Sequence, residues 1–276
     1  MRRGVSARGY ERRHPEIFNP VEQARLRDGL RRALAAVTSE TGRPPRALDF
    51  GCGTGNVTRR LLELGADVVA ADVAPELLRV VEQRFAGAGV ETALLNGIDL
   101  AGWDDDSLDF VASYSVLHHV HDYLAIVDEM LRVLRPGGVL YVDHEANELF
   151  YDRDGCVWEL RRAAREHELA RPGAWNPARR RWQRLLVPRN YRERWRRWRD
   201  PGYPWNAEGD IHVWEWDHID WPALREHVER GGAEVVVEED YLNFSSAYPG
   251  ELWQSYAGQC ADMRVLIARK RPAAAP

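Results

Sequence analysis

The sequence predicts an α/β fold in which helices cover both faces of one doubly wound, mostly parallel, seven-stranded sheet. Short apolar segments alternate with amphipathic helical segments over residues 46–145, as in a parallel sheet whose strands are joined by helices. A glycine-rich turn follows the first apolar segment, and two more strand-like segments lie near the C-terminus. The chain of 276 residues is long enough for one such domain with an added segment.

Each element has a local signal in the chain. Residues 21–39 are expected to be a helix, because Val21, Leu26, Leu30 and Leu34 recur at helical spacing. Short apolar runs bounded by turn residues predict strands at 47–50, 67–73, 92–97, 108–115, 139–145, 234–242 and 264–270. Helices are expected between them at 56–64, 75–86, 121–134 and 221–230.

The alternation stops after the fifth strand and resumes near residue 221, which divides the chain into parts. Residues 1–45 are expected to form an arm and a helix, and 46–145 the core of the domain. Residues 146–221 would be a helical insertion, and 222–270 would complete the core with a helix and two strands. Residues 271–276, an Ala/Pro tail, are expected to be disordered.

Composition restricts the classes of partner. No apolar run approaches the roughly 20 residues of a membrane-spanning helix, and no apolar segment follows the charged N-terminus. A cytoplasmic protein is therefore expected. The formal net charge of −5 argues against nucleic acid as the main partner. The three cysteines are far apart in the chain, so neither a disulfide nor a cysteine-based zinc site is expected.

The glycine-rich turn is the first candidate binding site. It connects the first strand to the first helix of the core, with glycines at 51, 53 and 55. Glycine lets the backbone approach a ligand closely, and the start of a helix offers free N–H groups to an anionic group. Asp49, just before the turn, can accept a hydrogen bond from a ligand ammonium. Asp72 ends the second strand, where a carboxylate can hold the hydroxyls of a ribose.

Four segments in order resemble the motifs of class I S-adenosylmethionine (SAM)-dependent methyltransferases. They are Asp49-Phe-Gly-Cys-Gly-Thr-Gly55, Ala71-Asp-Val73, Ser113-Tyr-Ser-Val-Leu-His-His-Val120 and Leu134-Arg-Pro-Gly-Gly138. The resemblance implies SAM as the cofactor and S-adenosylhomocysteine (SAH) as its product. It places the methionine end of SAM on Asp49, Gly51, Cys52, Gly53, Gly55 and Ser113. It places the ribose on Asp72 and the adenine near Val73, Gly97, Ile98 and Asp99.

Two features beside these motifs modify the resemblance. Members of the family often have Gly-Asp-Ala after the third strand, whereas this chain has Asn96-Gly-Ile-Asp99. The acid that meets the adenine is therefore left open. The arm before the first helix carries Tyr10, which is the candidate for covering the cofactor; a place on the surface or in an oligomer contact is the alternative.

Candidate catalytic groups follow the fourth and fifth strands. Methyl transfer is an in-line displacement, and an acceptor that carries a proton must also lose it. His118 and His119 follow the fourth strand, while His144 and Glu145 end the fifth. Because these strands are neighbours in the expected fold, the four residues should converge, and a histidine oriented by a carboxylate can accept a proton. The alternative is a metal held by histidines with Asp143 and Glu145, but His-His-x-His is no standard ligand spacing, so no metal is expected.

The insertion is expected to be a lid that selects the acceptor. Its residues 179–199 hold ten Arg and one Glu, and 200–221 hold six acids without Lys or Arg. Nine of the eleven Trp lie between 151 and 221, so the rings could pack the lid while the arginines reach water. The alternative is an anionic or lipid-linked acceptor, including peripheral contact with an anionic membrane. The acidic stretch disfavours nucleic acid.

These features predict a SAM-dependent methyltransferase that acts on a small molecule. O-methylation of a specialised metabolite, a sugar or a lipid-linked acceptor is expected, with a histidine removing the proton. The alternatives are C- or N-methylation of an amphipathic or anionic substrate, and a SAM-binding protein without methyl transfer.

Overall fold

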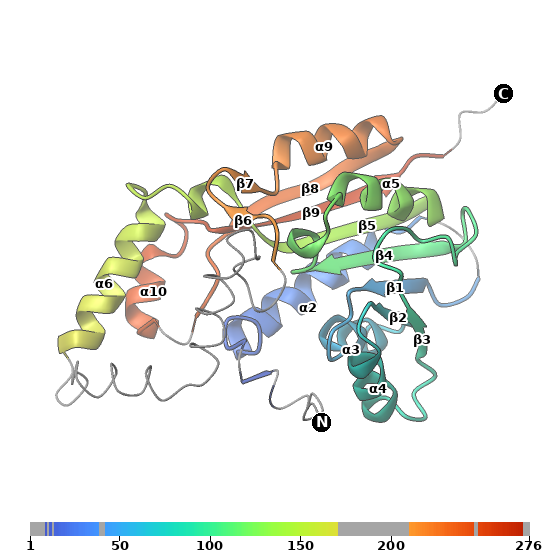
Figure 1. The fold of residues 1–276 in the computed structure, drawn as a ribbon, viewed down its shortest axis with the longest axis horizontal. Helices are drawn as coiled ribbons and strands as arrows, with labels where there is room; N and C mark the ends of the chain where they lie inside the picture. Colours follow the sequence, from blue (N-terminus) through green and yellow to red (C-terminus); the bar gives the residue numbers. More distant parts are fainter. Residues whose placement is uncertain are drawn as a thin grey trace, which may run out of the picture.

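The computed structural model describes residues 9, 11–12, 14–38, 42–170, 210–245 and 248–272. Its centre is a seven-stranded sheet with the order β3-β2-β1-β4-β5-β9-β8. In Figure 1 these strands follow one another from β8 at the top to β3 at the bottom. Strands β1 to β5 pair in parallel, and β9 pairs antiparallel with both β5 and β8. The predicted mostly parallel sheet is confirmed. The strands are β1 (Arg46–Phe50), β2 (Asp67–Asp72), β3 (Glu91–Leu94), β4 (Leu108–Tyr114), β5 (Leu134–Ala146), β8 (Ala233–Tyr241) and β9 (Met263–Lys270).

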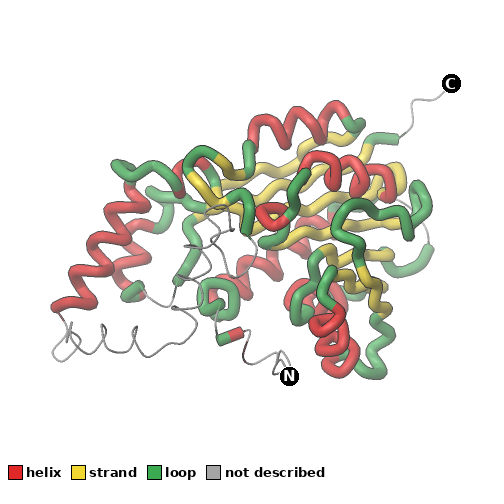
Figure 2. Tube along the Cα trace, in the orientation of Figure 1, coloured by secondary structure: helices red, strands yellow, loops and turns green. Residues whose placement is uncertain are grey.

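Helices cover both faces of the sheet because alternate strand residues point to opposite sides. Leu48, Val111 and Leu140 belong to one buried cluster, together with the apolar sides of α5 (Tyr123–Val133) and α9 (Trp221–Arg230). Their neighbours Ala47, Phe110 and Val139 belong to a second cluster on the other face. That face is covered by α2 (Pro20–Ala35) and α3 (Asn56–Glu63), while α4 (Pro75–Arg84) packs on β2. Figure 2 shows strands between the two helical layers.

The first helix differs from its prediction at both ends. It begins after Asn19, whose side chain accepts from the Glu22 N–H, and it ends at Ala35. Val21 is exposed, contrary to the prediction, and buried Ala33 joins Leu26 and Leu30 on the apolar side. The reason is geometric. Val21 precedes Leu26 by five residues, so the two side chains point in directions roughly 140° apart around the helix axis.

A second group of elements lies beyond the end of the sheet. It consists of η2 (Glu148–Phe150), α6 (Cys156–Ala170), the hairpin of β6 (Val213–Trp214) and β7 (Asp217–His218), and α10 (Gly250–Tyr256). Helices α6 and α10 lie side by side at this end in Figure 1, and Val157 and Leu160 share a buried cluster with Leu242. The Arg-rich residues 179–199 fall outside the described residues, so the predicted packing of that segment stays a prediction.

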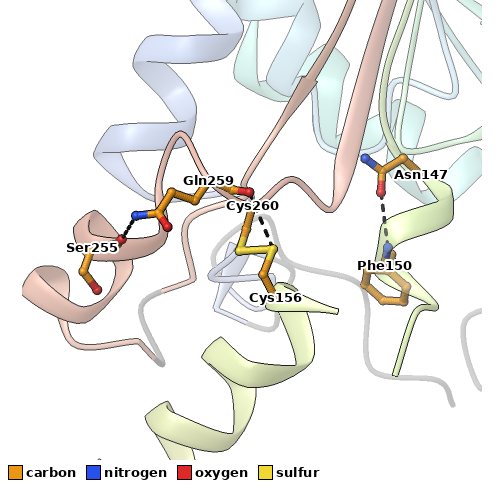
Figure 3. The surroundings of a disulfide bond; sticks show 6 residues. All are labelled: Asn147, Phe150, Cys156, Ser255, Gln259 and Cys260. Carbon is orange, nitrogen blue, oxygen red and sulfur yellow. Dashed lines mark hydrogen bonds between the residues drawn. A yellow bond between two sulfur atoms is a disulfide. The ribbon is translucent and has the colours of Figure 1, made fainter. Parts of the chain in front are cut away.

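A disulfide joins α6 to the loop between α10 and β9, contrary to the sequence-based expectation. Cys156 at the start of α6 is bonded to Cys260, which lies 104 residues later and just before β9. Figure 3 shows Cys260 following Gln259, whose side chain donates to the Ser255 carbonyl oxygen at the end of α10. The fold brings the two cysteines together across a distance in sequence that spacing alone cannot predict. Cys52 is a free, buried thiol.

Within the described ranges, the helices are too short or too polar to cross a membrane.

Candidate active site

The glycine turn lies between β1 and α3, at the carboxyl end of the sheet. Gly51 and Gly55 have φ values of 72° and 84°, which side chains with a Cβ rarely adopt. A Cβ on Gly51 would also lie 2.5 Å from Val116, so the backbone approaches the loop after β4 closely. The N–H groups of Gly51 and Cys52 donate to the Ala71 oxygen, and these bonds fix the turn against the end of β2.

Two buried carboxylates hold this turn in shape. Asp72 accepts the N–H of Gly53 at 2.9 Å through one oxygen and that of Ala74 at 2.8 Å through the other. Asp49 accepts both the N–H and the hydroxyl of Thr58 at 2.7 and 2.5 Å. Burial raises the pKa of Asp49 to about 7, although the Thr58 hydrogen bonds oppose this shift. The structure therefore places both predicted carboxylates beside the turn.

The pKa of Asp49 predicts a pH dependence of cofactor binding. A ligand ammonium beside Asp49 favours the ionised carboxylate, so binding below pH 7 must release a proton. SAH affinity should therefore be level above about pH 8 and fall about 25-fold between pH 7.5 and 5.5. Calorimetry across this range tests the expectation, with Asp49→Asn as a control that should give a nearly flat profile. An equally steep profile in the variant would remove Asp49 from contact with the ammonium.

The side chains predicted for the adenine lie at the same edge of the sheet. Val73 and Ile98 are 59% and 75% exposed, so both side chains are accessible to a flat ring. Gly97 lies next to Val73, because a Cβ placed on Gly97 would be 3.6 Å from Val73 Cγ1. One oxygen of Asp99 is engaged within its own loop by Asn96 Nδ2 and the Ala101 N–H. The adenine contacts of these residues stay a prediction.

Three further cofactor candidates have different standing. Ser113 is fully buried, and its hydroxyl has no hydrogen-bond partner among the described residues. Cys52 is also buried, and burial raises the pKa of its thiol well above the ordinary value, so the group is neutral. Tyr10 lies outside the described residues, so its covering role is untested.

His118 and Glu145 come together as the neighbouring strands predict. Glu145 is buried near the end of β5 and accepts the N–H groups of Val116 and Leu117, both at 2.8 Å. Its second oxygen lies 2.6 Å from His118 Nδ1, in the short helix η1 (Leu117–His119). Three contacts thus fix the carboxylate, and the carboxylate in turn fixes the imidazole.

The other two candidate histidines have further partners of their own, although the centroid of the His119 ring lies 4.1 Å from that of His118. His119 Nδ1 lies 3.1 Å from an oxygen of Asp210. His144 is buried, adopts a φ of 61°, and has its Nε2 3.2 Å from the side-chain nitrogen of Asn243. Burial lowers the pKa of His144, so this ring is neutral at neutral pH.

A cavity of about 290 Å³ opens beside His118. Its polar lining includes His144, Glu145, Asp210 and His212, and none of the described residues in its wall is Lys or Arg. Its apolar side is formed by Ala146, Phe150, Tyr151, Val213, Ile219 and Met263.

The segment carrying Asp210 is tied to the loop after β4. The N–H groups of Ile211 and His212 both donate to the His118 oxygen, at 2.8 and 3.0 Å. Asp210 was not predicted from the sequence as a site residue. It lies 91 residues after His119, and its only signal was its place in an acidic stretch bordering the core.

Asp143 is not a cavity residue, although its position in the sequence suggested a metal ligand. It is fully buried, pairs with Arg25 at 2.8 Å, and accepts from the hydroxyls of Tyr141 and Tyr241. In the parts of the chain that the structure describes, one group of three side chains could share a metal ion: His118, His119 and Asp210.

Comparison with known proteins agrees with this architecture. Residues 48–142 match a family model described as a methyltransferase domain. The ubiquinone biosynthesis O-methyltransferase of Xanthomonas campestris is 37% identical over 99 residues, which are 35% of this chain and 41% of that protein. An uncharacterized methyltransferase of Mycobacterium tuberculosis is 44% identical over 116 residues, or 42% of this chain and 40% of that protein. The chain thus spans less than half the length of these relatives.

The fold extends the similarity beyond the matched segment. The crystal structure of an S-adenosylmethionine dependent methyltransferase from Mesorhizobium loti superposes with a TM-score of 0.55 at 20% identity. The match covers 87% of this chain and 96% of that one. Motif order, family model and sheet topology agree: residues 48–142 are similar to a methyltransferase domain, and the sheet around them has a fold seen in an S-adenosylmethionine dependent methyltransferase.

Proposed function

We propose that the protein transfers the methyl group of SAM to a hydroxyl oxygen of a small molecule bound in the cavity. The strongest support is that the loop after β4 contacts both the glycine turn and the cavity side of the active site. Val116 packs where a Cβ of Gly51 would lie, and its N–H donates to Glu145. A cofactor on the glycine turn and an acceptor beside His118 would therefore be neighbours, as a direct transfer requires.

His118 is the proposed acceptor of the hydroxyl proton. The Glu145 carboxylate accepts a hydrogen bond from Nδ1–H, so the lone pair of the neutral ring is on Nε2. SAM bound at the glycine turn would supply the methyl group and leave as SAH, and Nε2 of His118 would take the proton that the acceptor hydroxyl loses. Glu145 then stabilises the imidazolium, which is the role of the carboxylate in other histidine–carboxylate pairs.

The cavity wall suggests the kind of acceptor. Its surface is mostly apolar, with a smaller part formed by hydrogen-bonding groups, and its described carboxylates are those of Glu145 and Asp210. This lining suits a neutral, hydroxylated molecule of the specialised-metabolite or sugar type better than an anionic one. The name of the Xanthomonas relative supports oxygen as the methylated atom. Arginines that could hold an anionic or lipid-linked acceptor lie in 179–199, outside the described residues.

The test is transfer of labelled methyl from SAM by the full chain to matched acceptors. Each set would contain a phenol or alcohol, the corresponding amine, and the methyl ether that lacks the proton. We expect label on oxygen only. Label on nitrogen or carbon would contradict the proposal. SAH binding without transfer to any acceptor would favour a SAM-binding protein that does not catalyse methylation.

A further inference from the structure

We propose that His118, His119 and Asp210 form a binding site for a divalent transition-metal ion of the zinc class, and that the ion switches off proton transfer at His118. The switching part rests on the proposed function, because it assigns regulation to the same imidazole. The ion-binding part depends only on the geometry of the three side chains.

The three side chains converge from two segments that are far apart in sequence. Each offers one ligand atom, and these atoms lie within 4.8 Å of one another. His119 Nδ1 and Asp210 Oδ1 are already 3.1 Å apart, which matches the separation of about 3 Å between two ligands that are each about 2.0–2.1 Å from one zinc ion. The rings of His118 and His119 have their centroids 4.1 Å apart, so the two imidazoles lie next to each other.

Backbone contacts hold this arrangement in place. The Ile211 and His212 N–H groups donate to the His118 oxygen, which keeps Asp210 next to the two histidines. The backbone that follows Asp210 is therefore fixed beside the two histidines. Two imidazoles and one carboxylate form a donor set used for zinc and other divalent transition metals.

Glu145 gives His118 the orientation that metal ligands commonly have. Its oxygen lies 2.6 Å from Nδ1, and the carboxylate is held by two backbone N–H groups. A carboxylate on one ring nitrogen fixes the tautomer and raises the basicity of the other, which then binds the metal. Nε2 of His118 is thus the expected ligand atom.

Occupancy by the ion excludes the proposed chemistry. The lone pair of Nε2 can bind a metal or accept a proton, but it cannot do both. Because His118 and Asp210 line the cavity, an ion can enter by the route of the acceptor. A bound ion would therefore convert the active site into an inactive form.

The experiment is titration of Zn²⁺ into the untagged, chelator-treated full chain, followed by calorimetry. We expect one ion per chain with a dissociation constant of about 1–10 μM. His118→Ala and Asp210→Asn should each weaken binding at least about tenfold, and Glu145→Gln about 10- to 100-fold. The matched control is His227→Ala. His227 Nε2 lies 2.7 Å from Asp128 Oδ1, and this His–Asp pair belongs to no three-ligand group in the described structure.

Two further measurements keep the outcomes separate. Histidine ¹⁵N spectra should show that Zn²⁺ shifts Nε2 of His118 while Nδ1 keeps its proton. SAH binding, measured on the same samples, should be unchanged in all variants. Absence of Zn²⁺ binding, or equal affinity in His118→Ala and the control, overturns the ion site. Zn²⁺ bound to Nδ1 of His118 overturns the proposal that the ion blocks proton transfer. Failure of the wild-type chain to bind SAH would count against the proposed function alone.

Discussion

Replacing His118 by alanine is expected to lower kcat for methyl transfer by about 10²- to 10⁴-fold and to leave SAM affinity nearly unchanged. The imidazole is held by Glu145 on the cavity side, whereas the predicted cofactor groups lie around the glycine turn. Removing it should therefore affect the chemical step and not cofactor binding. The measurement combines steady-state kinetics with calorimetry of SAH binding.

The matched control is His121→Ala, because His121 is exposed and follows His118 by three residues. Its rate should stay within about twofold of the wild type. A His118→Ala enzyme that is equally active would show that alignment of acceptor and methyl carries the reaction without this base. Glu145→Gln should fall between the two, because it keeps the shape of the carboxylate but weakens its support of the imidazolium.

The second large effect concerns stability and a buried ion pair under the site. Arg25 of α2 contacts Asp143 at 2.8 Å and Glu22 at 2.5 Å, and its guanidinium lies 3.7 Å from the centre of the Tyr241 ring. Both carboxylates are buried. Arg25→Ala leaves them without a cation, and removing one partner of a buried pair typically costs about 3–5 kcal/mol of the free energy of unfolding.

Denaturant unfolding of Arg25→Ala beside Arg32→Ala measures this effect. Arg32 also contacts a carboxylate with two nitrogens, at 2.8 and 2.6 Å from Glu239, but this pair is exposed. Exposed pairs contribute about 0–1 kcal/mol, so the control should change stability little. Similar losses in the two variants would contradict the importance assigned to the buried pair.

The core of the fold was predictable because its signals are local. The apolar strand segments, the glycine turn and the capped helices each follow from neighbouring residues, and Asp49 and Asp72 fall beside the turn as expected. The pairing of His118 with Glu145 was predictable from strand adjacency alone. The uses of these residues in binding and catalysis remain proposals.

The parts that were not predictable depend on contacts between distant segments. Cys156 and Cys260 meet only because α6 packs beside the loop before β9, and sequence spacing carries no signal for that. Asp210 reaches the active site through backbone bonds to His118. Asp143 was expected beside the catalytic groups, but Arg25, from a helix more than a hundred residues earlier, holds it in the interior.

In the proposed active site, the cofactor binds at the glycine turn with its ribose on Asp72. The most direct test is calorimetry of SAH with the wild-type chain, Asp72→Ala, and the control Asp67→Ala, whose residue is exposed at the other end of β2. We expect one site with a dissociation constant of about 1 μM, or roughly −8 kcal/mol. Asp72→Ala should weaken binding by about 1.5–3 kcal/mol, as expected for lost charge-assisted hydrogen bonds, while the control binds normally. Equal affinity in all three proteins, or no binding to the wild type, would contradict the claim.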